Sequence, residues 1–257
     1  MNQIINAAQA ARDLLSDVGW DKPGDLTLEE IAGSIGAIIK EEPLGGSEGR
    51  ILIKGNSAVI NLNSSISNVG KRNFVLAHEI GHFLLHKDLK LFVDNFKTLS
   101  EWHVKGIHEQ QANQFAEELL IPQALFISMV KGKRLNLALI EQVAAFFSAS
   151  LTATFIRYSR LGDFPMMIVY IEDGVIRWKM PSKDFPFQYL AYGSKVPSWT
   201  VAGDFFNGKS LEKIPVKIEA IEWFPDDYKL QNNENWKLWE QCYQVSPNGL
   251  ISCLWSF

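Results

Sequence analysis

Cysteine is scarce in this sequence, and long apolar runs are missing. Among 257 residues there are two cysteines, Cys242 and Cys253, both near the C-terminus. The first twenty residues contain charged side chains and no uninterrupted apolar stretch, so they lack the pattern of a signal peptide. No run approaches the roughly 18 apolar residues of a membrane span. We therefore expect a cytoplasmic protein with no membrane association and two reduced, buried thiols, although neighbouring strands could bring the thiols together as a disulfide.

The chain also has no excess of positively charged residues. The chain has 25 Lys and Arg against 29 Asp and Glu, a net charge of −4. No overall field therefore attracts nucleic acid, and any such contact would have to be local. Hydrophobic residues make up 47% of the chain, which is enough for a core in one large domain or two modest ones.

Helix and strand signals alternate in the first third of the chain. Residues 1–20 have apolar side chains at helical spacing, and Thr27 with Glu30 forms a capping-box pattern at the start of a second helix. Two β-rich runs follow, AIIKEEP and GRILIKGNSAVINLN, and KGNS within the second predicts a turn between paired strands. These strands lead into a helix that contains FVLAHEIGHFLLH.

Helical periodicity continues to Gly162. The segment HEQQANQFAEELLIP is predicted to end at Pro122, and Asn136 and Ser150 are predicted N-caps of two later helices, LALIEQVAAFF and LTATFIRYSRL. These two have the helix, short turn, helix layout of a DNA-binding pair, or they form an extension that packs on the core or docks a protein substrate. The basic residues nearby are Lys131, Lys133, Arg134, Arg157 and Arg160.

The composition changes after Pro165. MMIVYIEDGVIRWKMP consists of two β-rich runs around Asp173 and Gly174, which is a strong hairpin signal. KIPVKIEAIEWF and LISCLWSF are also strand-like, and six of the eight tryptophans fall in this part. We predict an α+β fold in three parts: a helical domain with a small sheet over 1–125, a helix-turn-helix-like extension over 126–162, and a β-rich domain over 163–257 with a sensory or substrate-recognition role.

The stretch FVLAHEIGHFLLH, residues 74–86, contains three of the five histidines. His78 and His82 are four residues apart, so on a helix they share a face and can bind one metal ion. Glu79 follows the first, which places its carboxylate beside such an ion, where it can accept a proton from water. The alternative is two ordinary polar residues on a half-buried helix. The apolar surroundings argue against it, because metal coordination would compensate for desolvation of the pair.

A catalytic metal needs a third protein ligand. His86 lies one turn beyond His82 and about two beyond His78, too far along the axis to reach the same ion, so we expect it to support a ligand instead.

Glu109, in the downstream helix, is a better candidate. It is expected to face the core, where a cation would compensate for its buried charge, unless it is simply solvated at the helix start. Asn113, one turn later, is placed to hydrogen-bond a ligand. Glu117 and His108 are the other ligand candidates, and Glu118 is expected to be solvated.

These two segments together resemble the ImmA/IrrE family of metallopeptidases, which pairs an H-E-x-G-H-x-L-L-H-like helix with an E-x-x-A-N-x-F-A-x-x-L-L-x-P-like helix. In the first segment the match is carried by His78, Glu79, Gly81, His82, Leu84, Leu85 and His86. In the second it is carried by Glu109, Ala112, Asn113, Phe115, Ala116, Leu119, Leu120 and Pro122. The resemblance spans roughly residues 1–162 and is loose beyond.

The resemblance implies a zincin-like hydrolase in which His78, His82 and Glu109 bind a divalent metal and Glu79 is the catalytic base. It implies cleavage of a helix-turn-helix transcriptional repressor, which derepresses stress-response or mobile-element genes. The ligand types suit zinc, with manganese as the alternative. The oxyanion donor is open, with three candidates: His103, His108 and Tyr158. The competing hypothesis is a non-catalytic regulatory protein with a structural metal, which binds a repressor or DNA through its helical pair.

Overall fold

The computed structural model describes residues 6–87, 106–133, 135–211, 213–230 and 235–256. The chain divides into two compact units. Unit 1 contains Met1–Met129 and Asn136–Thr154, and unit 2 contains Val130–Leu135 and Phe155–Phe257. The chain passes between the units after residues 129, 135 and 154, whereas the sequence suggested boundaries near 125 and 162. The three-part division stays a prediction.

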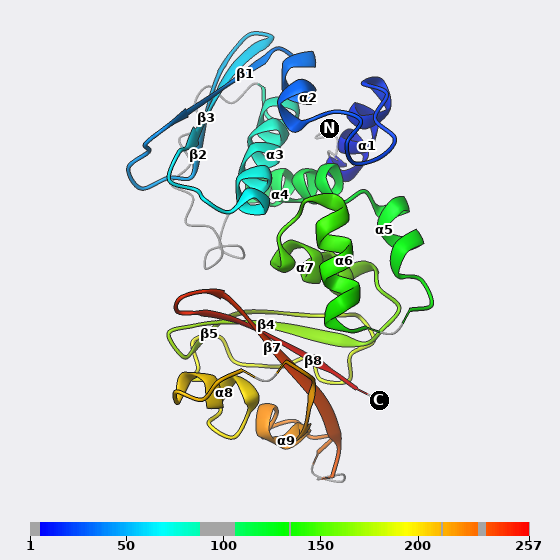
Figure 1. Cartoon of the computed structure of the whole chain (residues 1–257), viewed down its shortest axis with the longest axis vertical. Helices are drawn as coiled ribbons and strands as arrows, with labels where there is room; N and C mark the ends of the chain where they lie inside the picture. Colours follow the sequence, from blue (N-terminus) through cyan, green and yellow to red (C-terminus); the bar gives the residue numbers. More distant parts are fainter. Residues whose placement is uncertain (1–5, 88–105, 134, 212, 231–234, 257) are drawn as a thin grey trace. The chain divides into compact units, whose positions relative to one another are not determined.

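A three-stranded sheet lies near the start of unit 1 (Figure 1). Its strands are β1 (Ala37–Glu42), β2 (Gly49–Lys54) and β3 (Ser57–Asn63), in the order β1-β3-β2. β2 and β3 form the predicted hairpin, joined at Gly55, whose positive φ of 62° suits a two-residue turn. β1 pairs with β3 in parallel, so β2 is an edge strand of this sheet.

The helices of unit 1 begin where the sequence provides caps. α1 (Ala7–Asp17) is capped by Asn6, α2 (Leu28–Ser34) by the predicted capping box of Thr27 and Glu30, and α3 (Val69–Leu85) by Asn68. α4 (Ile107–Leu120) ends just before Pro122, as predicted.

Three further helices follow. They are α5 (Gln123–Val130), α6 (Leu137–Phe147) and α7 (Leu151–Leu161). The Asn136 side chain accepts from Leu139 N, and the Ser150 hydroxyl accepts from Ala153 N, so both predicted N-caps are confirmed. Among the described residues no single helix is long and apolar enough to cross a membrane. Only α6 and α7 taken together pass that test, by length and composition, and they are bent by 109°.

Unit 2 is built on a five-stranded antiparallel sheet. The strands are β4 (Met166–Glu172), β5 (Val175–Pro181), β6 (Val216–Glu219), β7 (Lys237–Ser246) and β8 (Gly249–Trp255), in the order β5-β4-β8-β7-β6. β4 and β5 form the predicted hairpin, and Asp173 and Gly174 both have the positive φ of a type I′ turn.

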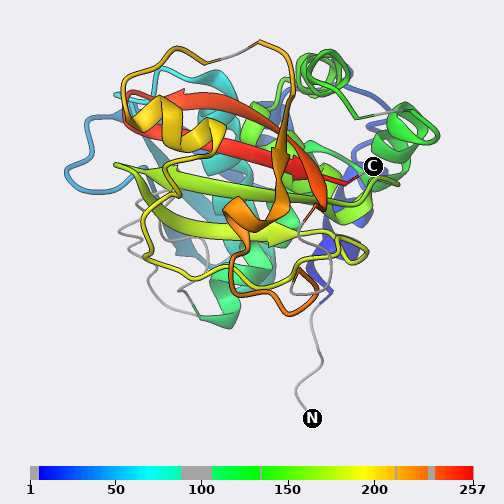
Figure 2. The same ribbon diagram turned by 90° about the horizontal axis from the view of Figure 1, so that it is seen from below.

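Two short helices, α8 (Val201–Phe206) and α9 (Ala220–Trp223), lie on the same face of this sheet (Figures 1 and 2). Alternate residues of β4, namely Met167, Val169 and Ile171, point into the core beneath them. The expectation that aromatic residues of this region form sheet core is confirmed, because Trp223, Phe187 and Phe224 are buried in the same cluster.

The two cysteines are free and buried, as predicted. β7 and β8 are neighbours, but Cys242 pairs with Ser252 and Cys253 pairs with Gln241. Directly opposed residues share a face, so this one-residue offset places the thiols on opposite faces of the sheet. Burial raises the pKa of both thiols, which keeps them protonated.

One strand prediction was only partly right. KIPVKIEAIEWF does not form a continuous strand, because β6 ends at Glu219 and the chain then turns into α9. Ala220 N donates to Trp236 O, and Trp223 is buried on the helix. The alternation of apolar residues continues through this segment, but tertiary packing decides the backbone conformation.

Candidate metal centre

The candidate site lies where α3 crosses α4, and small residues allow this close crossing. A Cβ added to Gly81 of α3 would lie 3.2 Å from Ala112 Cα and 3.1 Å from Phe115 Cδ1. Each distance is near the lower limit for such contacts. The absence of a side chain at Gly81 therefore lets α4 approach until Glu109 and Asn113 reach the histidines of α3.

His78, His82 and Glu109 meet at one point. Each offers one ligand atom, and these three atoms lie within 4.8 Å of one another. His78 Nε2 is 3.4 Å from Glu109 Oε2, and His82 Nε2 is 3.2 Å from Glu109 Oε1. All three residues are buried. Two imidazoles and one carboxylate are a ligand set that divalent metals use in catalytic sites, so these residues could hold a metal ion.

Hydrogen bonds at the other ring nitrogens orient both imidazoles. His78 Nδ1 is 2.9 Å from Asn113 Oδ1. The amide oxygen is only an acceptor, so His78 donates through Nδ1–H and its Nε2 keeps the lone pair. This hydrogen bond orients His78 and selects the tautomer that can bind a cation, while the predicted role of Asn113 as the partner of a metal ligand stays a prediction.

A longer chain of hydrogen bonds orients His82. Gln111 Oε1 lies 3.0 Å from His86 Nε2, and His86 Nδ1 lies 3.1 Å from His82 Nδ1. Since Gln111 accepts from His86 Nε2–H, the Nδ1 of His86 is left to accept from His82 Nδ1–H. The Nε2 of His82 then keeps its lone pair, and it lies 2.9 Å from His78 Nε2 and 3.2 Å from Glu109 Oε1. Burial lowers the pKa of His86, which favours the neutral ring that this chain of bonds needs.

Glu79 is buried beside the group on α3, with 2% of its surface exposed. It is not a member of the ligand group. Its carboxylate instead lies against the start of β2, because a Cβ on Gly49 would be 2.5 Å from Glu79 Oε1. Glu79 is therefore a buried carboxylate that follows the candidate ligand His78 in the chain and packs against the start of β2.

Two other candidates, His108 and Glu117, are not members of the ligand group. His108 is an exposed residue of α4 whose ring centroid is 4.7 Å from that of His86. Glu117 is buried on α4 and is not part of the ligand group.

The expectation that Glu118 is solvated is wrong. It is 1% exposed, its Oε1 is 3.2 Å from Arg12 Nη1, and the same oxygen accepts from Gln123 N at the start of α5. Glu118 therefore connects three helices. On the linear sequence it looked like one acidic residue among several, because its partners are distant in sequence.

The two remaining oxyanion candidates cannot be linked to the ligand group. Tyr158 is fully buried in unit 2, where burial and the charge of Asp163 raise its pKa to about 12. His103 lies outside the described residues.

Sequence reasoning missed two residues that lie close to this group. Gln111 lies within the motif HEQQANQFAEELLIP, but nothing in its spacing distinguishes it from Gln110 as a partner of His86. Gly49 lies 30 positions before Glu79, and only the folded chain brings them together.

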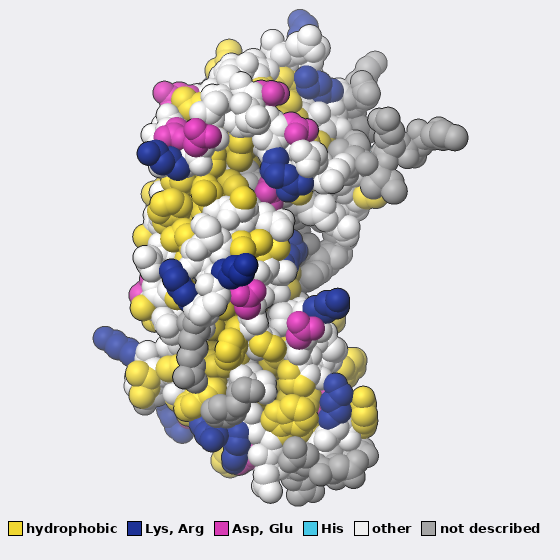
Figure 3. All heavy atoms as spheres, turned by 90° about the vertical axis from the view of Figure 1, so that its right-hand side faces the viewer, with side chains coloured by type: hydrophobic (Ala, Val, Ile, Leu, Met, Phe, Trp, Pro, Cys, Tyr) yellow, Lys and Arg dark blue, Asp and Glu magenta, His cyan; other side chains and the backbone are white. Residues whose placement is uncertain are grey.

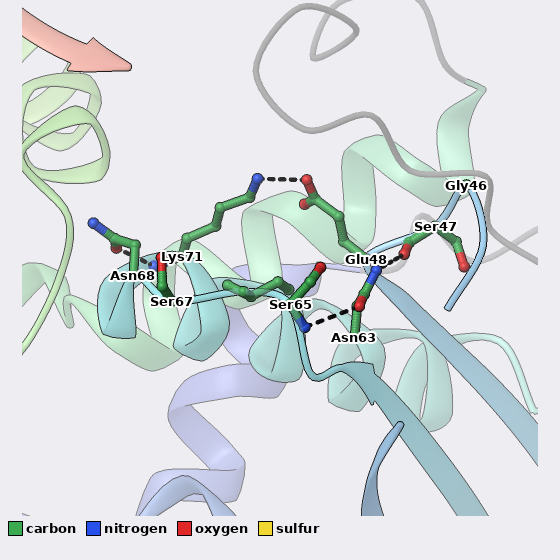
Figure 4. A pocket seen from close by; sticks show the side chains of 9 residues that line it. Gly46, Ser47, Glu48, Asn63, Ser65, Ser67, Asn68 and Lys71 are labelled. Carbon is green, nitrogen blue, oxygen red and sulfur yellow. Dashed lines mark hydrogen bonds and ion pairs between the residues drawn. The ribbon is translucent and has the colours of Figure 1, made fainter. Parts of the chain in front are cut away.

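A cavity of about 340 Å³ opens beside the start of β2 (Figure 4). Its walls come from the loop before β2, the end of β3 and the start of α3. Lys71 Nζ lies 2.5 Å from Glu48 Oε1 across it. Glu48 lines the cavity and directly precedes Gly49 in the chain, but neither Gly49 nor Glu79 is among the lining residues.

Comparisons with known proteins agree with this geometry. Residues 33–159 match the IrrE N-terminal-like domain family, Peptidase_M78. The chain is 34% identical over 102 residues to "Metallopeptidase ImmA" of Bacillus subtilis, covering 38% of this chain and 54% of that protein. It is 30% identical over 128 residues to "Radiation response metalloprotease IrrE" of Deinococcus radiodurans, covering 49% of this chain and 38% of that protein. The matches thus span about half or less of these relatives.

A solved structure resembles the fold over nearly the whole chain. It is titled "Mycobacterium tuberculosis transcriptional regulator", with a TM-score of 0.61 and 14% identity over 99% of this chain and 78% of that one. At this identity the likeness concerns the fold alone. The His78, His82 and Glu109 group thus lies within residues 33–159, the part of the chain that matches the IrrE N-terminal-like domain (Peptidase_M78).

Proposed function

We propose that this protein is a zincin-like metalloendopeptidase. The observation that carries the proposal is the convergence of two imidazole Nε2 atoms and one carboxylate on one point, with the buried Glu79 next to His78 on the same helix. His78, His82 and Glu109 hold the metal, which we assign as zinc, with manganese as the alternative. A metal bound there supplies Lewis-acid polarisation and lowers the pKa of its water.

The residues of the chain then perform the proton transfers. Glu79 accepts the proton of the attacking water and later delivers it to the leaving amine of the cleaved peptide bond. Asn113 and His86 keep both Nε2 lone pairs directed at the metal. A structural metal site has no need of a base in this position, so a buried Glu79 supports a catalytic role over a structural one.

The edge strand β2 supports a peptide as the substrate. Among the described strands it pairs only with β3, and it begins beside Glu79. An extended peptide can add to such an edge through main-chain hydrogen bonds. A scissile bond close to the base would follow from pairing near Gly49.

We further propose that the substrate is a helix-turn-helix transcriptional repressor, cleaved in the cytoplasm. The similarity to metallopeptidase ImmA supports a protein substrate, and a helix-turn-helix repressor is the substrate that the family resemblance implies. The bend of 109° between α6 and α7 falls in the range of helix-turn-helix pairs, about 90–120°. We assign this pair a role in docking the repressor.

The same pair is what favours the alternative, a non-catalytic regulator that binds DNA or a repressor. The basic residues of this helical pair support DNA binding less well than the sequence suggested, because Arg157 is only 6% exposed. On the face shown in Figure 3, basic side chains are interspersed with acidic ones. Direct DNA binding would require a more concentrated positive surface.

The test compares wild type with Glu79→Gln, which keeps the size of the side chain but removes the base. The substrate is the helix-turn-helix repressor encoded nearest to this protein, supplied with zinc or manganese. We expect wild type to cleave it and chelator to stop cleavage. Glu79→Gln should keep its metal and lose about 10²–10⁴-fold in rate.

Two outcomes contradict different parts of the proposal. If wild type leaves the repressor intact but cleaves a random peptide library, the substrate is wrong and the activity stands. If neither is cleaved with metal bound, the peptidase assignment fails. Normal cleavage by Glu79→Gln would reject Glu79 as the base.

A further inference from the structure

Gly49 is a glycine because of space, not backbone conformation. It opens β2, it is buried, and it is not among the residues with positive φ. A Cβ at this position would lie 2.5 Å from Glu79 Oε1, 3.2 Å from Glu79 Cδ and 2.7 Å from Val75 Cγ1. Two of these distances are shorter than real Cβ contacts show. Any other residue at position 49 would therefore have to displace the Glu79 carboxylate or β2.

The loop before Gly49 is fixed from the side of β3. Asn63 Nδ2 donates to Leu44 O at 2.9 Å and to Ser47 O at 2.8 Å, and Asn63 N donates to Glu48 O at 2.8 Å. Ser47 is 2% exposed. One asparagine thus satisfies three carbonyls of this loop, which limits how far Gly49 can retreat (Figure 4).

The loop is also tied to the helix that carries Glu79. Lys71 of α3 forms its ion pair with Glu48, the residue next to Gly49. Consecutive Cα atoms are about 3.8 Å apart, so this tie acts within one residue of the contact with Glu79. The Lys71–Glu48 ion pair and the contact at Gly49 therefore both hold the start of β2 against α3.

We propose that Gly49 is a positioning residue for Glu79, and that Asn63 and the Glu48–Lys71 pair hold Gly49 in place. The α-carbon of Gly49, which carries no side chain, packs directly against the Glu79 carboxylate. This contact determines the position at which Glu79 can accept a proton. The inference rests on the proposed function in that Glu79 is taken as the base. The contact itself is independent of the reaction.

Displacing the Glu79 carboxylate should lower the reaction rate strongly, because proton transfer depends on the position of the base. A misplacement of about 1 Å in a catalytic constellation can cost about 10²-fold in rate. Gly49 is not a member of the candidate metal-binding group formed by His78, His82 and Glu109. A methyl group at position 49 should therefore reduce turnover without removing the metal.

The test is Gly49→Ala, with Gly45→Ala as the matched control. Gly45 lies in the same loop, with no atom within 4 Å of its would-be Cβ and no positive φ. We expect Gly49→Ala to lower kcat about 100-fold, with KM and bound metal per chain unchanged, and Gly45→Ala to behave as wild type. Wild-type kcat in a folded Gly49→Ala would overturn the proposal.

A second variant covers the case in which Gly49→Ala folds poorly. Gly49→Ala/Val75→Ala removes the clash with the valine methyl, so the remaining conflict is with Glu79. We expect it to fold, bind metal and keep the low kcat. Full recovery of kcat would show that Val75, not Glu79, carried the effect, and would overturn the proposal.

A thermal-unfolding cycle tests the contact without any substrate. In an apo Glu79→Ala background the carboxylate is gone, so Gly49→Ala/Val75→Ala should lower the unfolding midpoint less than it does with Glu79 present. An equal shift in both backgrounds would overturn the contact. If wild type proves inactive on all substrates, the proposed function fails while this cycle still decides the role of Gly49.

Discussion

Glu109 of unit 1 and Glu240 of unit 2 are both buried, but they have opposite kinds of hydrogen-bonding partner. Glu240 of β7, 0% exposed, accepts from Val201 N at 2.9 Å, Ala202 N at 3.1 Å and the Ser252 hydroxyl at 2.8 Å. All three of these partners are hydrogen-bond donors. Burial raises the pKa of Glu240, while these hydrogen bonds lower it. Glu240 thus anchors α8 to the sheet.

The partners of Glu109 are instead nitrogen atoms that act as acceptors. Its oxygens lie 3.2 Å and 3.4 Å from the Nε2 atoms of His82 and His78, and the Nδ1 atoms of both rings are engaged elsewhere. Acceptors that converge in a buried place repel each other unless a cation joins them. The role of a buried carboxylate therefore depends on its partners: hydrogen-bond donors indicate a structural role, and converging acceptors indicate a metal site.

Removing the metal should produce the largest effect, and only in unit 1. We expect chelation to abolish hydrolysis, and His82→Ala to do the same. A ligand at about 100 times its Kd stabilises a fold by about 2.7 kcal/mol, which corresponds to roughly 5–10 °C for a unit of this size. Hydrogen–deuterium exchange measures this by segment. Zinc should protect α3 and α4 and leave β7 and β8 unchanged.

His82→Ala is also the control for that experiment. Its exchange in α3 and α4 should not respond to zinc. If zinc protected both units equally in wild type and in His82→Ala, the metal would be binding elsewhere, and the contrast between Glu109 and Glu240 would fail.

Glu240→Ala should show the reverse pattern. The substitution leaves two backbone N–H groups and one hydroxyl without their buried acceptor, so we expect unit 2 to lose about 3–5 kcal/mol. Tryptophan fluorescence during urea unfolding reports on it, since six of the eight tryptophans lie in this unit. Zinc affinity should stay within twofold of wild type. Asp226→Ala, an exposed acidic residue of the same unit, is the control and should cost under about 0.5 kcal/mol.

The sequence was informative wherever the signal is local. The capping box at Thr27, the hairpin at Asp173 and Gly174, and the caps at Asn136 and Ser150 each depend on residues within four positions, and each is confirmed. The His78 and His82 pair belongs to this class, because helical spacing alone places both on one face.

The sequence was uninformative where the partner is distant. Glu118 is buried by Arg12, about a hundred residues earlier, and Glu240 is satisfied by the start of α8. Strand β7 and helix α8 were not predicted, and Glu240 links them. The contact of Gly49 with Glu79 is likewise invisible until β2 packs on α3.

Gln111→Ala should give the smallest effect on zinc affinity. It tests whether Gln111, acting through His86, helps to orient His82. Without the Gln111 oxygen, His86 can carry its proton on either nitrogen, and in one tautomer His82 no longer has an acceptor at Nδ1. Partners of metal ligands typically contribute 10–100-fold to affinity, and Gln111 acts one step further out, so we expect roughly a tenfold loss of zinc affinity by competition with a chelating dye. Asn113→Ala, whose side chain touches His78 directly, should lose more. Gln114→Ala, exposed on the same helix, should lose nothing. If Gln111→Ala and Gln114→Ala bind zinc equally, the His86 tautomer is not fixed by Gln111, and the lone pair on His82 Nε2 must be set by His86 alone.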